Sequence, residues 1–273
     1  MRRVSIGLLV FGFGALIPTL SWADAVGVNV FGFVQADQFL GQECGSAVTF
    51  MASPASCSVT FVAPGGTQPG PVTASAAGNL ATGDLSGTIS VGATNGISAG
   101  EAQSIAVLAD VLSFSGGTAG ATGQVSMLAT GAISGTNCPF PGGCFASIEV
   151  KLSTSTGTPI VDLVDSNEFS VPGCVGQQCP PPVSPLSVST PFSLDAGPVQ
   201  FLFTLTTFCT SVPCQVNFND PITLTLPEGV TFTSESGEFL TATAVTPEPS
   251  SMLLLATGVA GIGCAAWRRC RRT

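Results

Sequence analysis

Two stretches of the chain, Phe201-Leu-Phe-Thr-Leu-Thr206 and Ile222-Thr-Leu-Thr-Leu226, alternate apolar and polar residues. Successive side chains of an extended strand point to opposite faces, so this alternation predicts two half-buried β-strands. Similar short β-prone runs recur along the chain, separated by Gly, Pro, Asn and Ser clusters. They predict strands at residues 26–33, 57–62, 85–91, 103–114, 124–133, 146–152, 199–208, 222–226, 231–233 and 240–245. Because no long amphipathic helix is visible between residues 24 and 246, we expect an all-β antiparallel sandwich or jelly roll there.

The amino terminus has the pattern of a secretory signal peptide. Arg2 and Arg3 precede an apolar run that contains a helix-breaking proline and ends in Ser21-Trp-Ala23. A basic start, a short apolar segment and small residues before a processing site are typical of export signals. Residues 1–23 are therefore predicted to form a signal helix handled by the Sec translocon and signal peptidase, with cleavage after Ala23 or Ala25.

The carboxyl terminus combines three features in a fixed order. A Pro247-Glu248-Pro249 motif is followed by an uncharged apolar stretch over residues 251–267, and arginines end the chain. The arginines are Arg268, Arg269, Arg271 and Arg272. Two prolines separated by one residue cannot enter a helix interior, so the motif should be extended and accessible. The apolar stretch predicts a transmembrane helix at 251–267, and the arginines predict a stop-transfer signal whose end stays in the cytoplasm.

This tail resembles the PEP-CTERM protein-sorting signal of Gram-negative bacteria, including its Leu253-Leu254-Leu255 start and its glycine-rich span. The resemblance implies recognition by an exosortase, a membrane cysteine transpeptidase that would cut near the motif. It also implies a transient inner-membrane anchor, then residence at the cell surface or in extracellular matrix, where the family is associated with exopolysaccharide and biofilm. The alternative is an ordinary single-span anchor after a Pro-Glu-Pro linker. Residues 106–117 and 226–237 also resemble stretches that recur in exported PEP-CTERM proteins.

The sequence thus predicts a signal peptide at 1–23, an ectodomain at 24–246 and a sorting signal at 247–273. The proline-rich run 179–185 is expected to be an extended crossover between two sheets, or else a linker between two β units.

The ectodomain is strongly acidic. All sixteen carboxylates lie between Asp24 and Glu248, and Lys151 is the one basic residue between the two terminal signals, which gives −15 over residues 24–267. Such a surface repels phosphates, so no nucleic acid is expected as a partner. Because the whole chain is 45% hydrophobic and 8% charged, its composition predicts a packed core instead of disorder.

Eight of the ten cysteines lie in the ectodomain and form four close pairs in the sequence. The pairs are Cys44 with Cys57, Cys138 with Cys144, Cys174 with Cys179, and Cys209 with Cys214. Each pair encloses turn-forming residues, so we expect four local disulfides in an oxidising compartment. The alternative is a four-cysteine zinc site built from the last two pairs, which the export signal and the absence of histidine disfavour.

Catalytic groups are scarce in the ectodomain. The chain has no histidine, which excludes Ser-His-Asp and Cys-His machinery and imidazole ligands. It also has no tyrosine. Asp162, Asp165 and Glu168 form the densest acidic cluster, which we expect to lie in a solvated loop. Asp110 stands in an apolar strand, where a sheet-edge or capped aspartate is the expected explanation. We therefore expect no enzyme activity and no cofactor, and the alternative is a hydrolase that uses carboxylates alone.

Two further alternatives concern calcium and ice. The same three acidic residues could gather oxygens around Ca²⁺, although no EF-hand or nonapeptide spacing is present. Thr-x-Thr pairs at 204/206, 223/225, 231/233 and 241/243 could present an ice-binding surface, but their intervals are irregular and threonine alternates naturally on strands. The favoured hypothesis is an exported structural or adhesive β-sandwich that is sorted by an exosortase.

Overall fold

A computed structural model describes most of the predicted ectodomain. The described residues are 26–36, 41–46, 49–61, 71–92, 100–135, 144–154, 156–168, 185–209 and 214–241. Contacts divide the chain into two units, Met1–Thr241 and Ala242–Thr273, and every described residue belongs to the first. The predicted signal helix and the predicted transmembrane helix lie outside the described residues. Within the described ranges, no helix is long and apolar enough to cross a membrane.

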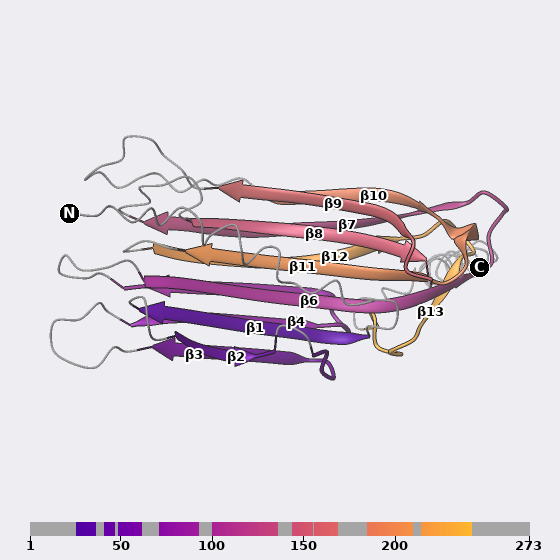
Figure 1. Ribbon diagram of the computed structural model, residues 1–273. Coiled ribbons are helices and arrows are strands. Elements are labelled where there is room, and N and C mark those ends of the chain that lie inside the picture. Colours follow the sequence, from indigo (N-terminus) through magenta and orange to yellow (C-terminus); the bar gives the residue numbers. More distant parts are fainter. Residues whose placement is uncertain are drawn as a thin grey trace, which may run out of the picture. The chain divides into compact units, whose positions relative to one another are not determined.

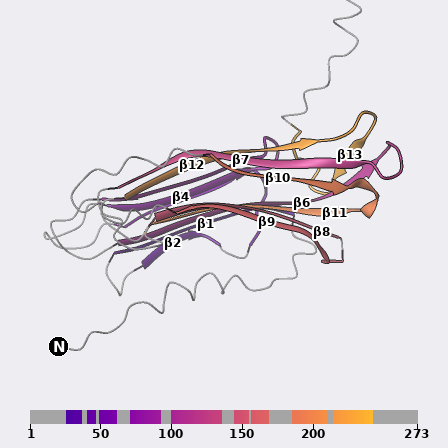
Figure 2. The same cartoon turned by 90° about the horizontal axis from the view of Figure 1, so that it is seen from above.

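Two antiparallel sheets form the layers of a sandwich (Figure 1, Figure 2). The seven-stranded sheet has the order β2 (Gly41–Gly45), β1 (Gly27–Ala36), β6 (Gly100–Ser115), β11 (Val199–Cys209), β8 (Cys144–Thr154) and β9 (Pro159–Glu168), and β13 (Thr231–Ser234) also pairs with β6. The six-stranded sheet has the order β10 (Leu186–Ser193), β7 (Thr122–Gly135), β12 (Cys214–Thr225), β5 (Asp84–Val91), β4 (Val72–Asn79) and β3 (Ala55–Phe61). A short 3₁₀-helix, Leu194–Ala196, lies between β10 and β11. The predicted all-β antiparallel sandwich is confirmed.

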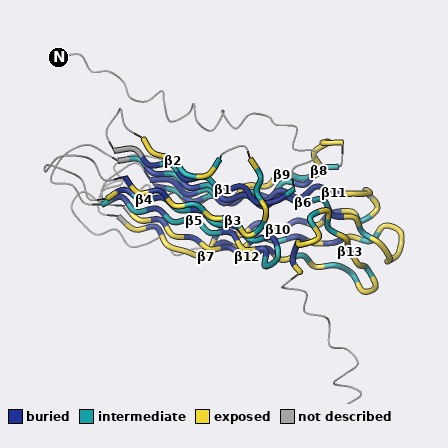
Figure 3. Tube along the Cα trace, turned by 90° about the horizontal axis from the view of Figure 1, so that it is seen from below, coloured by how far each residue is buried: buried dark blue, intermediate teal, exposed yellow. Residues whose placement is uncertain are grey.

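The core lies between the two layers, where alternate side chains of most strands are buried (Figure 3). β11 is buried along nearly its whole length and lies in the middle of the seven-stranded sheet. Its outward Leu202 belongs to a small cluster with Val107 and Ala109 of β6. Its Phe201 ring lies 5.2 Å from Phe192 and 6.1 Å from Phe203, and Phe203 lies 6.1 Å from Phe239. Burying one phenylalanine side chain stabilises a fold by about 1.5–3 kcal/mol, so this aromatic cluster contributes strongly to stability.

One link ties the two sheets together at each lateral edge. The Cys44–Cys57 disulfide joins β2 to β3, the edge strands of different sheets. Gly32 of β1 leaves room for this bridge, because a Cβ atom there would lie 2.9 Å from the Sγ of Cys44. At the opposite edge, Asp165 Oδ2 of β9 accepts a 2.8 Å hydrogen bond from the Ser187 amide of β10.

The structure extends and corrects the predicted set of strands. β2, β4, β9 and β10 are additional to it, because Ala, Gly, Pro or acidic residues weaken the β-propensity of these segments. The acidic cluster that we expected in a solvated loop lies on β9, an edge strand that leaves polar side chains exposed. The strand predicted at 240–245 is wrong for its described residues, since Leu240 and Thr241 form a turn in which Leu240 has a φ of 54°.

Candidate functional site

Residues 106–117 and 226–237, the two stretches that resemble recurring segments of exported PEP-CTERM proteins, lie side by side. β13 pairs with the end of β6, placing Thr231 opposite Ser115 and Ser234 opposite Leu112. β1 pairs with β6 up to Ala109, and β13 pairs with β6 from Leu112 onward. Asp110 therefore lies on β6 in the gap between these two partner strands. Sequence reasoning missed this contact because the two segments are far apart in the chain and neither one identifies the other.

Asp110 is fully buried, and both of its carboxylate oxygens accept hydrogen bonds. Oδ1 accepts from the Val111 amide at 2.7 Å and from the Ser236 amide at 3.2 Å. Oδ2 accepts from the Ser234 hydroxyl at 2.8 Å and also from the Ser236 hydroxyl. A buried carboxylate that is surrounded by donors holds a structure together, so of the two explanations expected from the sequence, a sheet-edge or a capped aspartate, Asp110 fits the capped one.

Asp220 of β12 is also fully buried, but its environment is different. Its Oδ1 accepts a 2.9 Å hydrogen bond from the Leu128 amide of β7, where Pro221 interrupts the ladder between β12 and β7. Its Oδ2 has no hydrogen-bond partner among the residues that the structure describes. Burial raises the pKa of Asp220 to about 7, with the Leu128 hydrogen bond acting to lower it and the charge of Asp84 acting to raise it.

Asp84 and Asp220 do not form a catalytic pair, although their strands are neighbours. Asp84 is exposed on the outer face of the six-stranded sheet, whereas Asp220 faces the interior. A ligand on the outer face can therefore touch only Asp84. Sequence reasoning missed Asp220 because Asn219-Asp-Pro221 is typical of a turn and not of a strand interior.

The acidic residues of β9 do not converge on one point. Asp162 Oδ2 lies 3.9 Å from Lys151 Nζ, whereas Asp165 bonds to β10 of the other sheet. Residues three apart on a strand point to opposite faces, so these two carboxylates are not placed to bind one cation. The side chain of Glu168 lies outside the described residues. Across the described ranges, no group of three or more His, Cys, Asp or Glu is placed to hold a metal ion.

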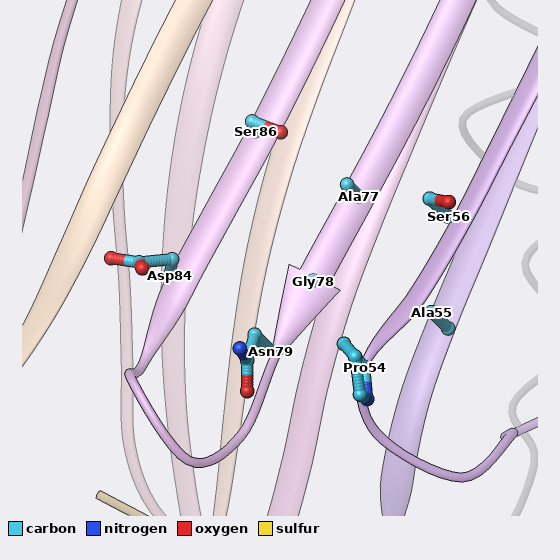
Figure 4. A pocket seen from close by; sticks show the side chains of 8 residues that line it. All are labelled: Pro54, Ala55, Ser56, Ala77, Gly78, Asn79, Asp84 and Ser86. Atoms are coloured by element: carbon cyan, nitrogen blue, oxygen red, sulfur yellow. The ribbon is translucent and has the colours of Figure 1, made fainter. Parts of the chain in front are cut away.

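A pocket of about 200 Å³ opens where β3, β4 and β5 meet their turns (Figure 4). Its lining consists of Pro54, Ala55, Ser56, Ala77, Gly78, Asn79, Asp84 and Ser86. Asp84 is the single ionisable residue of this lining. Glycosidases that work with carboxylates alone place two of them across the scissile bond, so this pocket supplies half of that requirement.

The outer face of the six-stranded sheet is mostly polar and nearly uncharged, although Leu128 of β7 is an exposed apolar residue on it. Its outward positions follow the strand register in rows of hydroxyl and amide side chains. One row is Ser58, Ser75, Thr88 and Asn217, and the next is Thr60, Thr73, Ser90, Gln215 and Ser134. Asp84 is the one charged residue among the outward positions described for these strands. We call this surface, defined by those two rows, the hydroxyl-amide face.

The outer face of the seven-stranded sheet combines charged and apolar residues. Lys151 makes ion pairs with Glu149 and Asp162. The rings of Phe145 and Phe208 lie 5.2 Å apart on the same sheet. A small separate cluster consists of Val107, Ala109 and Leu202, with Phe50 and Ile105 packed against it. The two outer faces of the sandwich therefore differ in chemistry.

The Thr-x-Thr pairs do not form one array. The pair 204/206 lies on β11 and the pair 231/233 on β13 of the seven-stranded sheet, whereas the pair 223/225 lies on β12 of the other sheet. Thr241 lies in a turn, and Thr243 lies outside the described residues.

The cysteines follow the predicted pairing in the one pair whose two side chains are both described. Cys44 and Cys57 form the predicted disulfide, with Cα atoms 5.7 Å apart. Cys144 and Cys209 are buried opposite one another on β8 and β11, and their Sγ atoms lie 3.2 Å apart. Both cysteines take part in disulfides, and a distance of 3.2 Å is too long for a bond between these two sulfur atoms. The local pairs predicted for them, with Cys138 and Cys214, stay predictions because the side chains of those partners lie outside the described residues. Three other predicted partners, Cys138, Cys174 and Cys179, lie outside the described residues, as does the side chain of Cys214.

The predicted sorting residues also lie outside the described part of the chain. They are Pro247, Glu248, Pro249, Arg268, Arg269, Arg271 and Arg272. Their assignment therefore rests on sequence.

The described unit is a two-layer antiparallel β-sandwich that is joined to a carboxyl-terminal tail. Residues 245–272 match the family model of the PEP-CTERM protein-sorting motif. The chain therefore carries a PEP-CTERM sorting signal, which covers about a tenth of its length. A signal of this family implies an exported protein that transits the membrane and is processed by an exosortase.

No curated protein matches this chain significantly. A solved structure described as "Structure of infectious bursal disease virus Gt strain" is 10% identical, with a TM-score of 0.25, and the match covers 76% of this chain and 38% of that chain. The chain thus spans less than half the length of that protein, and so low a score carries no argument about fold or function.

Proposed function

We propose that the ectodomain is a non-catalytic structural or adhesive module, which the sorting tail delivers to the cell surface or extracellular matrix. The observation that carries this proposal is the hydroxyl-amide face. Its two rows cross the six-stranded sheet and contain no charged residue, and Asp84 is the one charged residue among the other outward positions described for this sheet. A surface of this kind can make many weak hydrogen bonds to a polar partner, directly or through water.

The carboxylates support the same proposal over a carboxylate-only hydrolase. Asp110 is engaged by Ser234 and Ser236, and Asp220 faces the interior, so neither one is open to a substrate. Asp84 stands as a single carboxylate in its pocket. General acid and base roles need two carboxyl groups that face the same bond.

Exopolysaccharide is the candidate partner of this module. Uncharged sugar hydroxyls can exchange hydrogen bonds with serine, threonine and asparagine side chains without a charge that must be neutralised. The net charge of −15 over residues 24–267 favours a neutral partner over a polyanion.

The test adds charge to one face at a time. Ser58→Asp with Asn217→Asp changes the hydroxyl-amide face, and Gln42→Asp with Ser113→Asp adds the same charge to exposed positions of the seven-stranded sheet. In cells that lack the native protein, the first pair should reduce surface attachment and biofilm mass several-fold, whereas the second pair should restore both. Equal attachment with either pair, or polysaccharide hydrolysis by the purified protein that Asp84→Asn abolishes, would contradict the proposal.

A further inference from the structure

We propose that β9 is the docking edge for a second copy of this chain, so that the seven-stranded sheets of two copies join through an antiparallel pair of β9 strands. β9 is the last strand of its sheet, at the top of the sandwich in Figure 1, and β8 is its one ladder partner among the described strands. Successive residues of a strand direct their N–H and C=O groups to opposite sides, so every second residue of β9 leaves a donor and an acceptor for another strand. This association is independent of what the hydroxyl-amide face binds.

The side chains of β9 are unusually apolar for an exposed edge. Four large apolar side chains are exposed in the part of the chain that the structure describes, and three of them, Ile160, Leu163 and Val164, lie on β9. Val164 is 60% exposed on the outer face of the sheet, and Leu163 is 38% exposed although it belongs to the inner face. A long apolar edge strand is a ready template for pairing with another chain.

The three other strands that end the sheet orders carry features that discourage such pairing. β2 is five residues long, and its Cys44 is bonded to Cys57 of β3, the neighbouring edge of the six-stranded sheet. β10 contains Pro191, which has no N–H to donate. β9 has a proline only at its first position, and Asp165 ties it to Ser187 of β10. β9 is thus held in place as a strand, so pairing requires little new ordering of the chain.

Charge selects the register of the β9 pair. Carboxylates that face each other across two strands repel, and the chain is acidic. Opposed residues of an antiparallel pair have numbers with a constant sum, so a two-fold axis at Leu163 places Asp162 opposite Val164 of the second copy. The same axis places Val161 opposite Asp165 and the two Leu163 side chains opposite each other. Between residues 161 and 165, no carboxylate then faces another.

The two carboxylates in this register are already engaged within their own copy. Asp162 Oδ2 lies 3.9 Å from Lys151 Nζ, and Asp165 Oδ2 accepts the 2.8 Å hydrogen bond from the Ser187 amide. Self-pairing therefore covers Leu163 and Val164 without bringing two unpartnered charges together, which makes a second copy the fitting occupant. Stable interfaces bury about 1,200–2,000 Å², and one strand pair lies at the small end of this range. We therefore expect a reversible dimer that forms where copies are concentrated.

The experiment cross-links the full chain in cells that export it. Leu163→Cys places two thiols at opposed positions of the proposed pair, where Cα atoms are about 4.5–5.5 Å apart and a disulfide can form. Leu128→Cys is the matched control, because Leu128 is similarly exposed, at 43%, on the other sheet. After mild oxidation, thiol blocking and non-reducing electrophoresis, Leu163→Cys should give at least about tenfold more dimer than the control, since pairing raises the effective thiol concentration. Equal amounts of dimer, no dimer, or a conjugate with a different protein would overturn the proposal.

A second set of variants tests the register without Leu163→Cys. Co-expression of Asp162→Cys and Val164→Cys should give more dimer than either variant alone, because these positions face each other in the proposed pair. Equal dimer from the mixture and from the single variants would contradict the register.

A charge on the edge tests the pairing itself. In the Leu163→Cys chain, Val164→Lys should lower the amount of dimer at least about tenfold, because lysines on an edge strand oppose pairing. Leu128→Lys is the control and should leave the dimer unchanged. Protease resistance compared with the parent chain reports whether each variant is folded. A dimer that persists in the Val164→Lys chain, or is lost equally in the Leu128→Lys chain, would contradict docking at β9.

Discussion

The sorting tail and the ectodomain carry different kinds of information. The tail, residues 245–272, consists of local features in a fixed order, and each of them is a property of neighbouring residues. The ectodomain depends on contacts such as Asp110 with Ser234, which are 124 residues apart. The comparison teaches that destination and stability should be separable in this protein. Tail variants should change where the protein goes, and ectodomain variants should change how firmly it folds.

The largest effect is expected from the sorting motif itself. Replacing Pro247, Glu248 and Pro249 with alanines should abolish processing, because the extended motif would be lost next to the apolar span. The unprocessed chain should stay with the inner membrane, as followed by cell fractionation and intact mass. The thermal midpoint of the ectodomain should not change, because the tail belongs to a separate contact unit. Thr246→Ala is the control and should be processed normally. Normal processing of the triple-alanine variant, or failed processing of Thr246→Ala, would contradict the role of the Pro-Glu-Pro motif.

The next effect concerns Asp220 and pH. Its pKa is raised from 3.8 to about 7 in the fold, so the native state favours the neutral carboxyl. The stability that this group contributes is full below pH 3.8, decreases as the pH rises, and is lost above about pH 7. The total change is about 4 kcal/mol at most, since one pKa unit corresponds to about 1.4 kcal/mol.

Asp220→Asn keeps an acceptor for the Leu128 amide and removes the charge. Denaturant unfolding between pH 4 and pH 8 should therefore show a smaller loss of stability with rising pH than in the parent protein. Glu228→Gln, at an exposed position, is the matched control and should leave the parent profile unchanged. Parallel profiles for the parent and Asp220→Asn would mean that Asp220 does not titrate in this range.

A somewhat smaller loss is expected when the lateral bridge is removed. Cys44→Ser with Cys57→Ser should lower the free energy of unfolding by about 3 kcal/mol, because the bridge restricts the unfolded chain over a short loop. The secreted protein should still reach its normal location. The measurement is denaturant unfolding of the parent and the variant, with and without reductant. If reductant does not lower the free energy of unfolding of the parent protein, this bridge does not stabilise the fold.

The smallest of these changes is expected at Asp110. Asp110→Ala leaves the hydroxyls and amide of Ser234 and Ser236 without their acceptor, which should cost about 2 kcal/mol. Asp162→Ala removes an exposed carboxylate whose ion pair with Lys151 is long, and it should cost little. Hydrogen exchange should also show faster opening of residues 234–239 in Asp110→Ala. If Asp110→Ala changed the sorting of the protein without changing its stability, destination and stability would not be separable as proposed.

Much of the fold was predictable from residue alternation. The runs around Phe201 and Ile222 lie on β11 and β12, and the sandwich class follows from many short strands with turn residues between them. The missed strands have weak local signals. β4 is rich in Ala and Gly, and β10 contains Pro191, so tertiary pairing outweighs local propensity there.

The candidate sites were less predictable, because they depend on register. The Cys44–Cys57 bridge follows from spacing, since its partners lie on consecutive strands. The Cys144–Cys209 contact does not, because β8 and β11 are separated by two strands in sequence and adjacent in space. Asp162 and Asp165 form a cluster in sequence but point to opposite faces of β9, which only the strand assignment reveals.

The central claim is that the tail directs an exported sandwich to an exosortase. The most direct measurement compares the intact mass and the location of the protein in cells with and without that enzyme. The account predicts a mature protein shortened near Pro247-Glu-Pro249 and found outside the inner membrane when the enzyme is present. Without the enzyme, it predicts a longer form held at the inner membrane with an unchanged thermal midpoint. The same mass and the same location in both strains would contradict it.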